Sequence, residues 1–222
     1  MTDELSEEHI KKHCPHCDTS SEAYKYLLER TDNFSVVCDA HPITEGHILI
    51  IPKQHLSCVG EYPENLYKDF LILYKKVSEF LFKIYGSISS FEHGKFGQTV
   101  FHSHIHLIPF KGRVADIIPE GNDKLTVLND LSEIRNIFKE YGGYLFLSIE
   151  DNKWVVDVNL AVPRFFRDRF AKVLNRPHRG NWKEMHVKEN GHSEPETEAR
   201  KTKERWMKYV NWYSRPFVLG FI

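Results

Sequence analysis

Phe101-His102-Ser103-His104-Ile105-His106-Leu107-Ile108-Pro109 is the stretch that decides the fold of this 222-residue chain. Its three histidines stand at i, i+2 and i+4, among aromatic and aliphatic residues that favour a strand over a helix. In a strand, residues two apart point to the same face, roughly 6.5–7 Å from one another. The stretch therefore predicts a β-strand that presents three imidazoles on one face and ends at Pro109.

Three aligned imidazoles allow three interpretations. The strand could simply be rich in histidine and face water. It could bind a catalytic metal, since neutral imidazole is a good ligand for zinc, copper or iron. One imidazole could instead attack phosphorus while its neighbours handle protons and charge. A catalytic metal on all three histidines is the weaker idea, because no suitably spaced carboxylate ligand follows them in the sequence.

Length and composition bound the class of protein. A chain of 222 residues with 41% hydrophobic residues suits one large globular domain, or an ordinary domain with a substantial extension. A net charge of −1 gives no electrostatic argument for binding nucleic acid or a membrane surface. Residues 1–8 are acidic rather than apolar, and no apolar run approaches the roughly 20 residues of a membrane-spanning helix. We expect a soluble, cytoplasmic protein.

Four cysteines, at positions 14, 17, 38 and 58, are too few for a disulfide framework in a chain of this size. Cys14-Pro15-His16-Cys17 is a CxxC motif. A redox CxxC motif should lie between a strand and a helix, whereas only a short charged segment with helical character, residues 3–13, precedes this one. Half of a zinc site is therefore favoured over a redox motif, provided that two further ligands exist.

The remaining pattern predicts an α+β fold. Residues 63–85 carry apolar side chains at i, i+3, i+4 and i+7, the pattern of an amphipathic helix, and we expect this helix to pack on a mainly antiparallel sheet. Further helices are expected at 20–30, 128–140, 165–174 and 199–213, with loop at 114–126 and a polar, mobile segment at 188–198. Strands are expected at 34–38, 46–52 and 87–91, with a hairpin of 144–149 and 154–158.

The first 113 or so residues resemble the histidine triad (HIT) superfamily of nucleotide hydrolases and transferases. The matching pieces occur in the family's order. They are Asp39 at a strand end, Gly46-His47-Ile48-Leu49-Ile50-Ile51-Pro52-Lys53-Gln54-His55, Gly97-Gln98-Thr99-Val100, and the histidine stretch 102–109. The last piece is similar to the family's His-φ-His-φ-His-φ-φ signature, from which Ser103 departs because φ is an apolar residue. We therefore expect a HIT-like catalytic domain at 1–113 and a C-terminal α/β extension of helices and a hairpin at 114–222.

The resemblance implies a role for each matching residue. His104 would be the nucleophile that forms a covalent nucleotidyl-imidazole intermediate, and His106 would bind phosphate and assist proton transfer. Gln98 and Thr99 would contact phosphate oxygens or the leaving group, and Asp39 would accept hydrogen bonds from the ribose hydroxyls. Asp39 could instead be only a turn residue and Gln98 an ordinary polar group at a strand end. His47 is expected to be structural, and His93 is left open between a scaffold position and an active-site neighbour.

Some branches of the superfamily carry a zinc site built from an N-terminal CxxC motif, a histidine after the Pro-Lys turn and the first histidine of the triad. The corresponding residues here are Cys14, Cys17, His55 and His102. Two thiolates and two imidazoles are a normal ligand set for tetrahedral structural zinc, which leaves no open position for catalysis. The resemblance thus implies a structural zinc ion and no organic cofactor.

The extension is less informative. Residues 163–170 and 175–182 combine arginines with aromatic residues, which could cover the second half of a nucleotide. For Phe165, Phe166 and Phe170 we favour the alternative that they belong to the core. The extension loosely resembles those of some HIT proteins that hydrolyse dinucleoside polyphosphates.

The function expected from the resemblance is a nucleotide hydrolase that cleaves at an α-phosphorus, with diadenosine tetraphosphate as the type of substrate. The alternatives are a nucleoside phosphoramidate hydrolase, a nucleotidyl transferase, or a nucleotide-binding sensor or adaptor without turnover. The family commonly forms homodimers, so a homodimer is the expected assembly.

Overall fold

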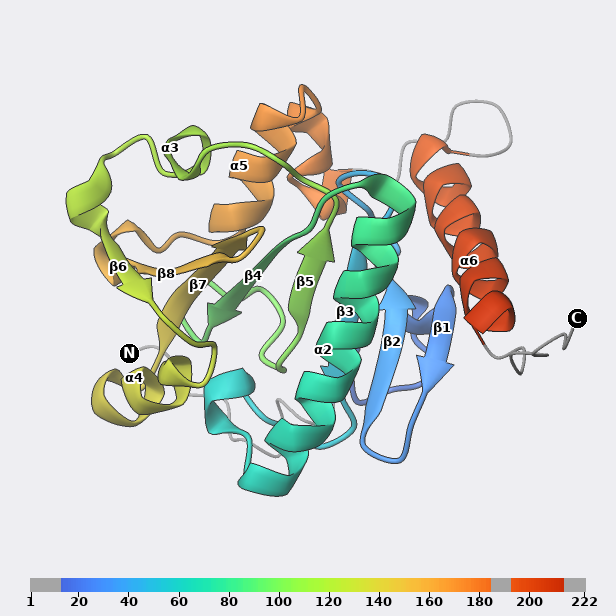
Figure 1. Cartoon of the computed structure of the whole chain (residues 1–222), viewed down its shortest axis with the longest axis horizontal. Coiled ribbons are helices and arrows are strands. Elements are labelled where there is room, and N and C mark those ends of the chain that lie inside the picture. The colour runs from blue at the N-terminus through green and yellow to red at the C-terminus, as the bar shows by residue number, and fades with distance from the viewer. Residues whose placement is uncertain (1–12, 185–192, 214–222) are drawn as a thin grey trace, which may run out of the picture.

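Eight strands form one antiparallel sheet in the order β1-β2-β3-β5-β4-β7-β8-β6 (Figure 1). The computed structural model describes residues 13–184 and 193–213 of the chain. The strands are β1 (Leu27–Arg30), β2 (Phe34–Cys38), β3 (Ile48–Pro52), β4 (Ser89–Gly94), β5 (Ile105–Ile108), β6 (Leu125–Leu128), β7 (Tyr144–Ile149) and β8 (Asn152–Val156). The predicted α+β class with an antiparallel sheet is confirmed. Every residue of β2, β3, β4, β5 and β7 is buried, because helices cover most of both faces and the segment around Tyr24 covers β2 and β3 on one of them.

Helix α2 (Glu64–Tyr85) lies across one face of the sheet (Figure 1) and confirms the helix predicted at 63–85. Gly86 ends it in the left-handed conformation that glycine adopts without strain, with a φ of 80°. Helix α6 (Glu194–Tyr213) packs beside α2, where the rings of Trp206 and Phe80 lie 5.0 Å apart. Alternate residues of the sheet and the apolar stripe of α2 together form the larger hydrophobic core.

The opposite face of the sheet is covered by α3 (Val114–Ile117) and α5 (Phe165–Val173). Phe165, Phe166 and Phe170 are at most 1% exposed, which confirms that they belong to the core. Phe91 of β4 contacts Phe166 and Phe170, with ring centroids 5.4 and 5.1 Å apart. Helix α5 thus holds the extension against the face of the sheet that carries His93 and His106.

The extension continues the sheet of the first half rather than lying beside it. Strand β7 pairs with β4 along six residue pairs, from Ser89 opposite Ile149 to Gly94 opposite Tyr144. The hairpin of β7 and β8 confirms the predicted one, while β6 lies partly inside the segment predicted as loop. Because residues 125–128 belong to β6, the helix predicted at 128–140 begins only at Glu133, as α4 (Glu133–Tyr141). A division into units at residue 113 stays a prediction.

Two local predictions are wrong, and pairing with the neighbouring strand explains the first. The segment 20–30 was expected to be a helix but forms a short 3-10 turn (Glu22–Tyr24) followed by β1. Pairing of β1 with β2 outweighs the weak local preference for helix. The helix predicted at 3–13 lies almost entirely outside the described residues, as does much of the segment 188–198. The final helix starts at Glu194, earlier than the predicted residue 199.

The histidine strand is shorter than predicted. Strand β5 begins at Ile105, and its ladder with β3 runs from Ile50 opposite Ile105 to Ile48 opposite Leu107. Before Ile105 the backbone forms hydrogen bonds with a loop instead of a strand: the Ser103 N–H donates to the Leu56 carbonyl at 2.6 Å. His102 and His104 therefore precede the strand, and the three imidazoles do not share one face as predicted.

Five further 3-10 turns connect the elements of the described chain: Val59–Glu61, Asn122–Lys124, Val158–Leu160, Pro177–Arg179 and Trp182–Glu184. None of the helices between residues 13 and 184 or between 193 and 213 combines the length and apolar character that crossing a membrane requires.

Candidate active site and metal centre

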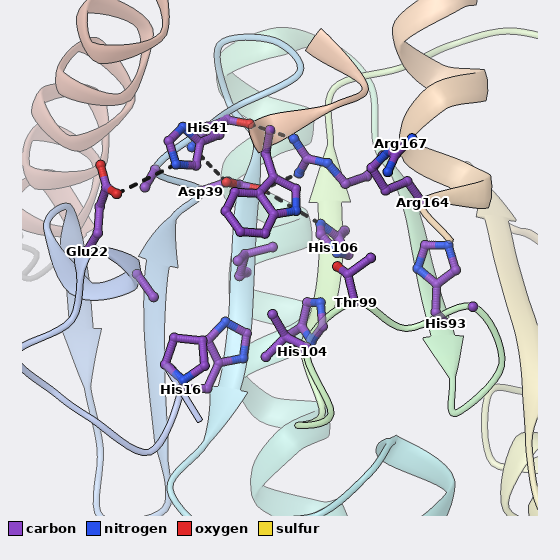
Figure 2. A pocket seen from close by; sticks show the side chains of 17 residues that line it. His16, Glu22, Asp39, His41, His93, Thr99, His104, His106, Arg164 and Arg167 are labelled. Carbon is purple, nitrogen blue, oxygen red and sulfur yellow. Dashed lines mark hydrogen bonds and ion pairs between the residues drawn. The ribbon is translucent and has the colours of Figure 1, made fainter. Parts of the chain in front are cut away.

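A cavity opens on the α5 face of the sheet, over the region where β2, β3, β5 and β4 lie side by side. Figure 2 shows Asp39 on one side of this cavity, His104 and His106 in the middle, and His93 on the other side. Thr99 also lines it, together with side chains from the extension. The structure thus brings His104, His106, Thr99 and Asp39 together around one cavity, while their roles toward a nucleotide stay predictions.

His104 is held in one tautomer by the backbone. Its Nδ1 lies 2.6 Å from the His102 carbonyl oxygen, and a carbonyl can only accept a hydrogen bond. Nδ1 therefore carries the proton, and the lone pair on Nε2 stays free. Burial lowers the pKa of His104, although the bond to the His102 carbonyl opposes that effect. His104 is consequently a neutral imidazole with a free nucleophilic nitrogen beside the cavity.

His106 is held in the tautomer that donates into the cavity. The Ile43 N–H donates to His47 Nδ1 at 3.1 Å, so the proton of neutral His47 is on Nε2. That N–H donates in turn to His106 Nδ1 at 2.8 Å, which places the His106 proton on Nε2. The rings of His106 and His104 lie 5.0 Å apart. A hydrogen-bond donor therefore stands next to the nucleophilic nitrogen, and His47 orients it, as expected of a structural histidine.

Asp39 is tied to the extension. Its carboxylate accepts from Arg167 Nη1 at 2.6 Å and from the His41 N–H at 2.8 Å. Burial alone would raise the pKa of Asp39, but the charge of Arg167, followed by that of His47, lowers it to about 2. Asp39 is therefore ionised and already bonded, and its predicted contact with ribose hydroxyls stays a prediction. Asp39, His47 and His106 also cluster their donor atoms, but the two imidazoles are bonded to each other rather than free for a metal.

Gln98 and Thr99, the two residues predicted to contact phosphate, differ in position. Thr99 is exposed and lines the cavity, as a residue that contacts phosphate must. Gln98 is buried, and its Nε2 donates to the Ser57 carbonyl at 2.6 Å, away from the residues that line the cavity. Of the Gln98 amide, only Oε1 has no hydrogen-bond partner among the described residues, so a catalytic or phosphate-binding role would have to use that atom. The role stays a prediction.

The departure at Ser103 has a structural reason. Its hydroxyl is fully buried, contacts Tyr62 Oη at 2.7 Å and donates to Glu92 Oε1 at 2.9 Å. Glu92 also accepts from the Val59 N–H and from Tyr144 Oη. Burial raises the pKa of Glu92 to about 7 in spite of these donors. An apolar residue at position 103 would leave this buried polar network without one of its donors.

Several cavity residues were missed by reasoning from the sequence. The ring of His16, inside the CxxC motif, lies 4.8 Å from that of His104. Arg164, Arg167 and Trp182 come from the extension, and Trp182 stacks on His41 at 5.8 Å. The combination of arginines with aromatic residues at 163–170 and 175–182 was the available signal for the latter three. Nothing in the sequence singled out His16.

Cys14, Cys17, His55 and His102 bring four ligand atoms within 4.8 Å of one another. The Sγ of Cys17 lies 3.2 Å from His55 Nδ1 and 3.5 Å from His102 Nδ1, and the Sγ of Cys14 lies 3.4 Å from His102 Nδ1. These separations suit the edges of a tetrahedron with metal bonds of about 2.0–2.3 Å. The donor set therefore fits zinc.

His102 is oriented for this centre by its second nitrogen. Nε2 lies 2.8 Å from the Pro52 carbonyl oxygen and so carries the proton, which leaves the Nδ1 lone pair facing the two cysteines. Burial lowers the pKa of His102 to about 4, which keeps the ring neutral, as a metal ligand must be. This cluster lies directly beside His104, because the His102 carbonyl is the group that fixes the His104 ring.

Comparisons with known proteins match the first half of the chain. The HIT domain family matches residues 20–112. A HIT-like protein of Borreliella burgdorferi, described as uncharacterized, is 32% identical over 96 residues, which are 40% of this chain and 69% of that protein. Adenosine 5'-monophosphoramidase HNT1 of Candida albicans is 29% identical over 126 residues, 51% of this chain and 80% of that protein. Adenylylsulfatase HINT3 of Arabidopsis thaliana is 35% identical over 91 residues, 39% of this chain, and the match spans only 46% of that protein.

Proposed function

Because this chain belongs to the HIT domain family, we propose that it is a nucleotide hydrolase that cleaves at an α-phosphorus through a covalent intermediate on His104. The observation that carries the proposal is the pair of tautomers in the cavity. His104 offers a free Nε2 lone pair, because its Nδ1–H donates to the His102 carbonyl. His106 offers an Nε2–H, because its Nδ1 accepts from His47. A nucleophile and a donor for a phosphate oxygen are thus both set before substrate arrives.

The reaction has two displacements. His104 Nε2 attacks the α-phosphorus, the N–P bond forms, and the bond from phosphorus to the leaving group breaks. His106 Nε2–H donates to a phosphate oxygen and stabilises the charge that develops there. Water then attacks the phosphorus, the N–P bond breaks, and the products are a nucleoside monophosphate and the restored imidazole. No separate base is needed for the first step, since neutral imidazole is already a competent nucleophile.

Dinucleoside polyphosphates of the diadenosine tetraphosphate type are the first substrates that we propose. The names of the Candida and Arabidopsis relatives add two further classes, adenosine phosphoramidates and adenylyl sulfate. All three share a nucleoside 5'-phosphate whose α-phosphorus carries a displaceable group. They differ only in the leaving group, and assays can therefore distinguish them.

Turnover by purified protein tests the proposal. Wild type, His104→Ala and His178→Ala are incubated with diadenosine tetraphosphate, AMP-amide and adenylyl sulfate, and AMP release is measured. His178 is exposed and lies outside the cavity, so its variant controls for the loss of a histidine elsewhere. His104→Ala should lose roughly three or more orders of magnitude in kcat/KM, because the substitution removes the proposed nucleophile.

Each outcome of this assay separates the alternatives. Absence of wild-type turnover on all three compounds, with binding retained, would favour a nucleotide sensor or adaptor. Transfer of AMP to an added acceptor phosphate, rather than to water, would identify a nucleotidyl transferase. Turnover that survives in His104→Ala would refute the covalent intermediate.

We further propose that Cys14, Cys17, His55 and His102 hold a structural zinc ion. Four protein ligands leave no position for a substrate or water, so the metal would supply no step of the reaction. Its effect would be to hold the N-terminal segment, with His16, against the loop that carries His104. A homodimer also stays a prediction, which the mass of the protein in solution tests.

A further inference from the structure

We propose that His93 is a fourth active-site histidine, whose Nδ1–H donates a hydrogen bond to the leaving group and whose tautomer is set by the C-terminal extension. This inference rests on the proposed function. It concerns a residue of β4 and a helix of the extension, neither of which the reaction described above uses.

The register of the sheet places His93 across from the nucleophile. The ladder of β4 and β5 pairs Ser89 with Ile108, Ser90 with Leu107 and Phe91 with His106. Continuation of that register puts position 93 opposite position 104. His93 follows Phe91 by two residues and so points to the same face of the sheet as His106. Its ring lines the cavity (Figure 2) and is only 6% exposed.

The order of the strands places His93 on the leaving-group side. Asp39 directly follows β2, and His93 lies near the end of β4. The strand order β2-β3-β5-β4 therefore puts these two residues on opposite sides of β5. Figure 2 shows the same arrangement, with His104 and His106 between Asp39 and His93. If the nucleoside lies toward Asp39 and the α-phosphorus lies at His104, the group that is displaced extends toward His93.

The extension determines which nitrogen of His93 carries the proton. The Phe166 N–H donates to His93 Nε2 at 3.3 Å, so that nitrogen must offer a lone pair. Burial, and then the neighbouring His104 and Arg167, lower the pKa of His93 to about 3, so the ring is neutral. A neutral ring with a lone pair on Nε2 carries its proton on Nδ1. No hydrogen bond is formed by this Nδ1–H among the described residues, and the ring lines the cavity, so the donor is available to a bound group.

The contact between the extension and the site is close at two points. Phe166 lies in the first turn of α5, where backbone N–H groups lack partners within the helix, and His93 accepts one of them. Gly97, which begins the segment before the triad, approaches the Val162 carbonyl so closely that a Cβ would lie 2.6 Å from its oxygen. A Cβ on Gly97 would also lie 3.5 Å from Cδ2 of His93. The extension therefore packs against both sites, through Val162 at the Gly97 segment and through the first turn of α5 at His93.

The competing explanation is that His93 serves only as a cap for α5. Two substitutions separate the roles, because they resemble different edges of the imidazole. In His93→Gln the amide can reach the position of Nε2, which keeps an acceptor for the Phe166 N–H but removes the donor at Nδ1. In His93→Asn the amide lies near the position of Nδ1, which keeps that donor but removes the cap.

The experiment measures kcat/KM of wild type and both variants on AMP aryl esters whose phenols range from good to poor leaving groups, together with thermal unfolding. We expect His93→Gln to keep its melting temperature and to lose about 10²-fold in kcat/KM on the poorest leaving group, since a donor to a developing charge is removed. The loss should shrink toward severalfold on the best leaving group. His93→Asn should lower the melting temperature and keep most of the turnover.

The failure of this inference can be told from the failure of the proposed function. No wild-type turnover would refute the proposed function itself. Wild-type turnover with a His93→Gln loss that is absent, or equal on every ester, would show that His93 is only a helix cap. Nitrogen-15 shifts of the His93 ring in the wild-type protein give an independent check that needs no variant. A proton on Nε2 instead of Nδ1 would overturn the proposal.

Discussion

Removal of Arg167 should destabilise the fold and the active site together. This arginine is 6% exposed, donates to Asp39 at 2.6 Å and to the His41 carbonyl at 2.7 Å, and is the link from α5 to the end of β2. In Arg167→Met the side chain keeps most of its length but loses its charge and its donors. The Asp39 carboxylate, 7% exposed, then stays buried without its main partner.

The size of the effect follows from the pKa of Asp39. A value of about 2 in place of the ordinary 3.8 corresponds, at about 1.4 kcal/mol per pH unit, to roughly 2.5 kcal/mol of stability near neutral pH. That amount is what remains after Arg167 and His47 have overcome the cost of burial. Loss of Arg167 also exposes part of that cost, so the free energy of unfolding should fall by about 3–5 kcal/mol.

Chemical denaturation of four proteins tests this value: wild type, Arg167→Met, Asp39→Asn and the double variant. The double variant should be more stable than Arg167→Met, because it no longer buries an unpaired charge. Lys172→Ala, which removes an exposed positive charge from the same helix, should change stability by less than about 0.5 kcal/mol.

The dependence on pH gives the sign of the effect. The lowered pKa of Asp39 stabilises wild type above about pH 4, and this contribution is lost as the pH falls through about 2. In Arg167→Met, burial is no longer opposed by the charge of Arg167 and raises the pKa of Asp39. Protonation of Asp39 then removes the buried charge and stabilises the variant. Its deficit should therefore shrink as the pH is lowered from about 7 toward 4. A deficit below about 1 kcal/mol at neutral pH, or one that grows on acidification, would refute the reasoning.

Three further predictions concern separate parts of the molecule. Cys14→Ser should lower both the zinc content, measured by elemental analysis, and the melting temperature, and a chelator should lower both in wild type. Cys38→Ala, which lies outside the cluster, should keep its zinc. Trp206→Ala should lower the free energy of unfolding, measured with denaturant, by about 3–5 kcal/mol, because the ring is 1% exposed and packs on Phe80. A loss below about 1 kcal/mol would show that α6 is not part of the core. Burial raises the pKa of Glu92 from 4.5 to about 7. Wild type should therefore lose up to about 3 kcal/mol of stability as the pH rises from about 4.5 to about 7, and Glu92→Gln should flatten this part of the stability profile.

Local spacing predicted those parts of the fold that depend on which residues share a face. The helix α2 follows from its apolar stripe, and β2 and β3 follow from runs of apolar residues that suit burial on both faces. The segment that forms β1 has no comparable local signal, and its pairing with β2 determines its conformation. The partner strand follows after only three residues, but the preference for strand comes from β2 and from the pairing rather than from the residues of β1 themselves.

The histidine stretch shows the same division within the site. The spacing of His102, His104 and His106, with the motifs around it, indicated the family, and that resemblance implied the ligand set of the proposed metal centre. The tertiary structure decided that β5 begins only at Ile105, which separates the direction of His102 from that of the other two. Backbone carbonyls and a neighbouring imidazole then decided which nitrogen of each ring carries a proton.

What the sequence by itself determined is therefore the chemistry that is available: an ordered set of imidazoles, a pair of thiolates and an aspartate at the end of a strand. What only the tertiary structure decided is how distant groups complete it. Arg167 is 128 positions from Asp39, and Phe166 is 73 positions from His93. The physical reason is that charge pairing and tautomer choice depend on distances of about 3 Å between atoms. Only the folded sheet and the helix packed on it set those distances.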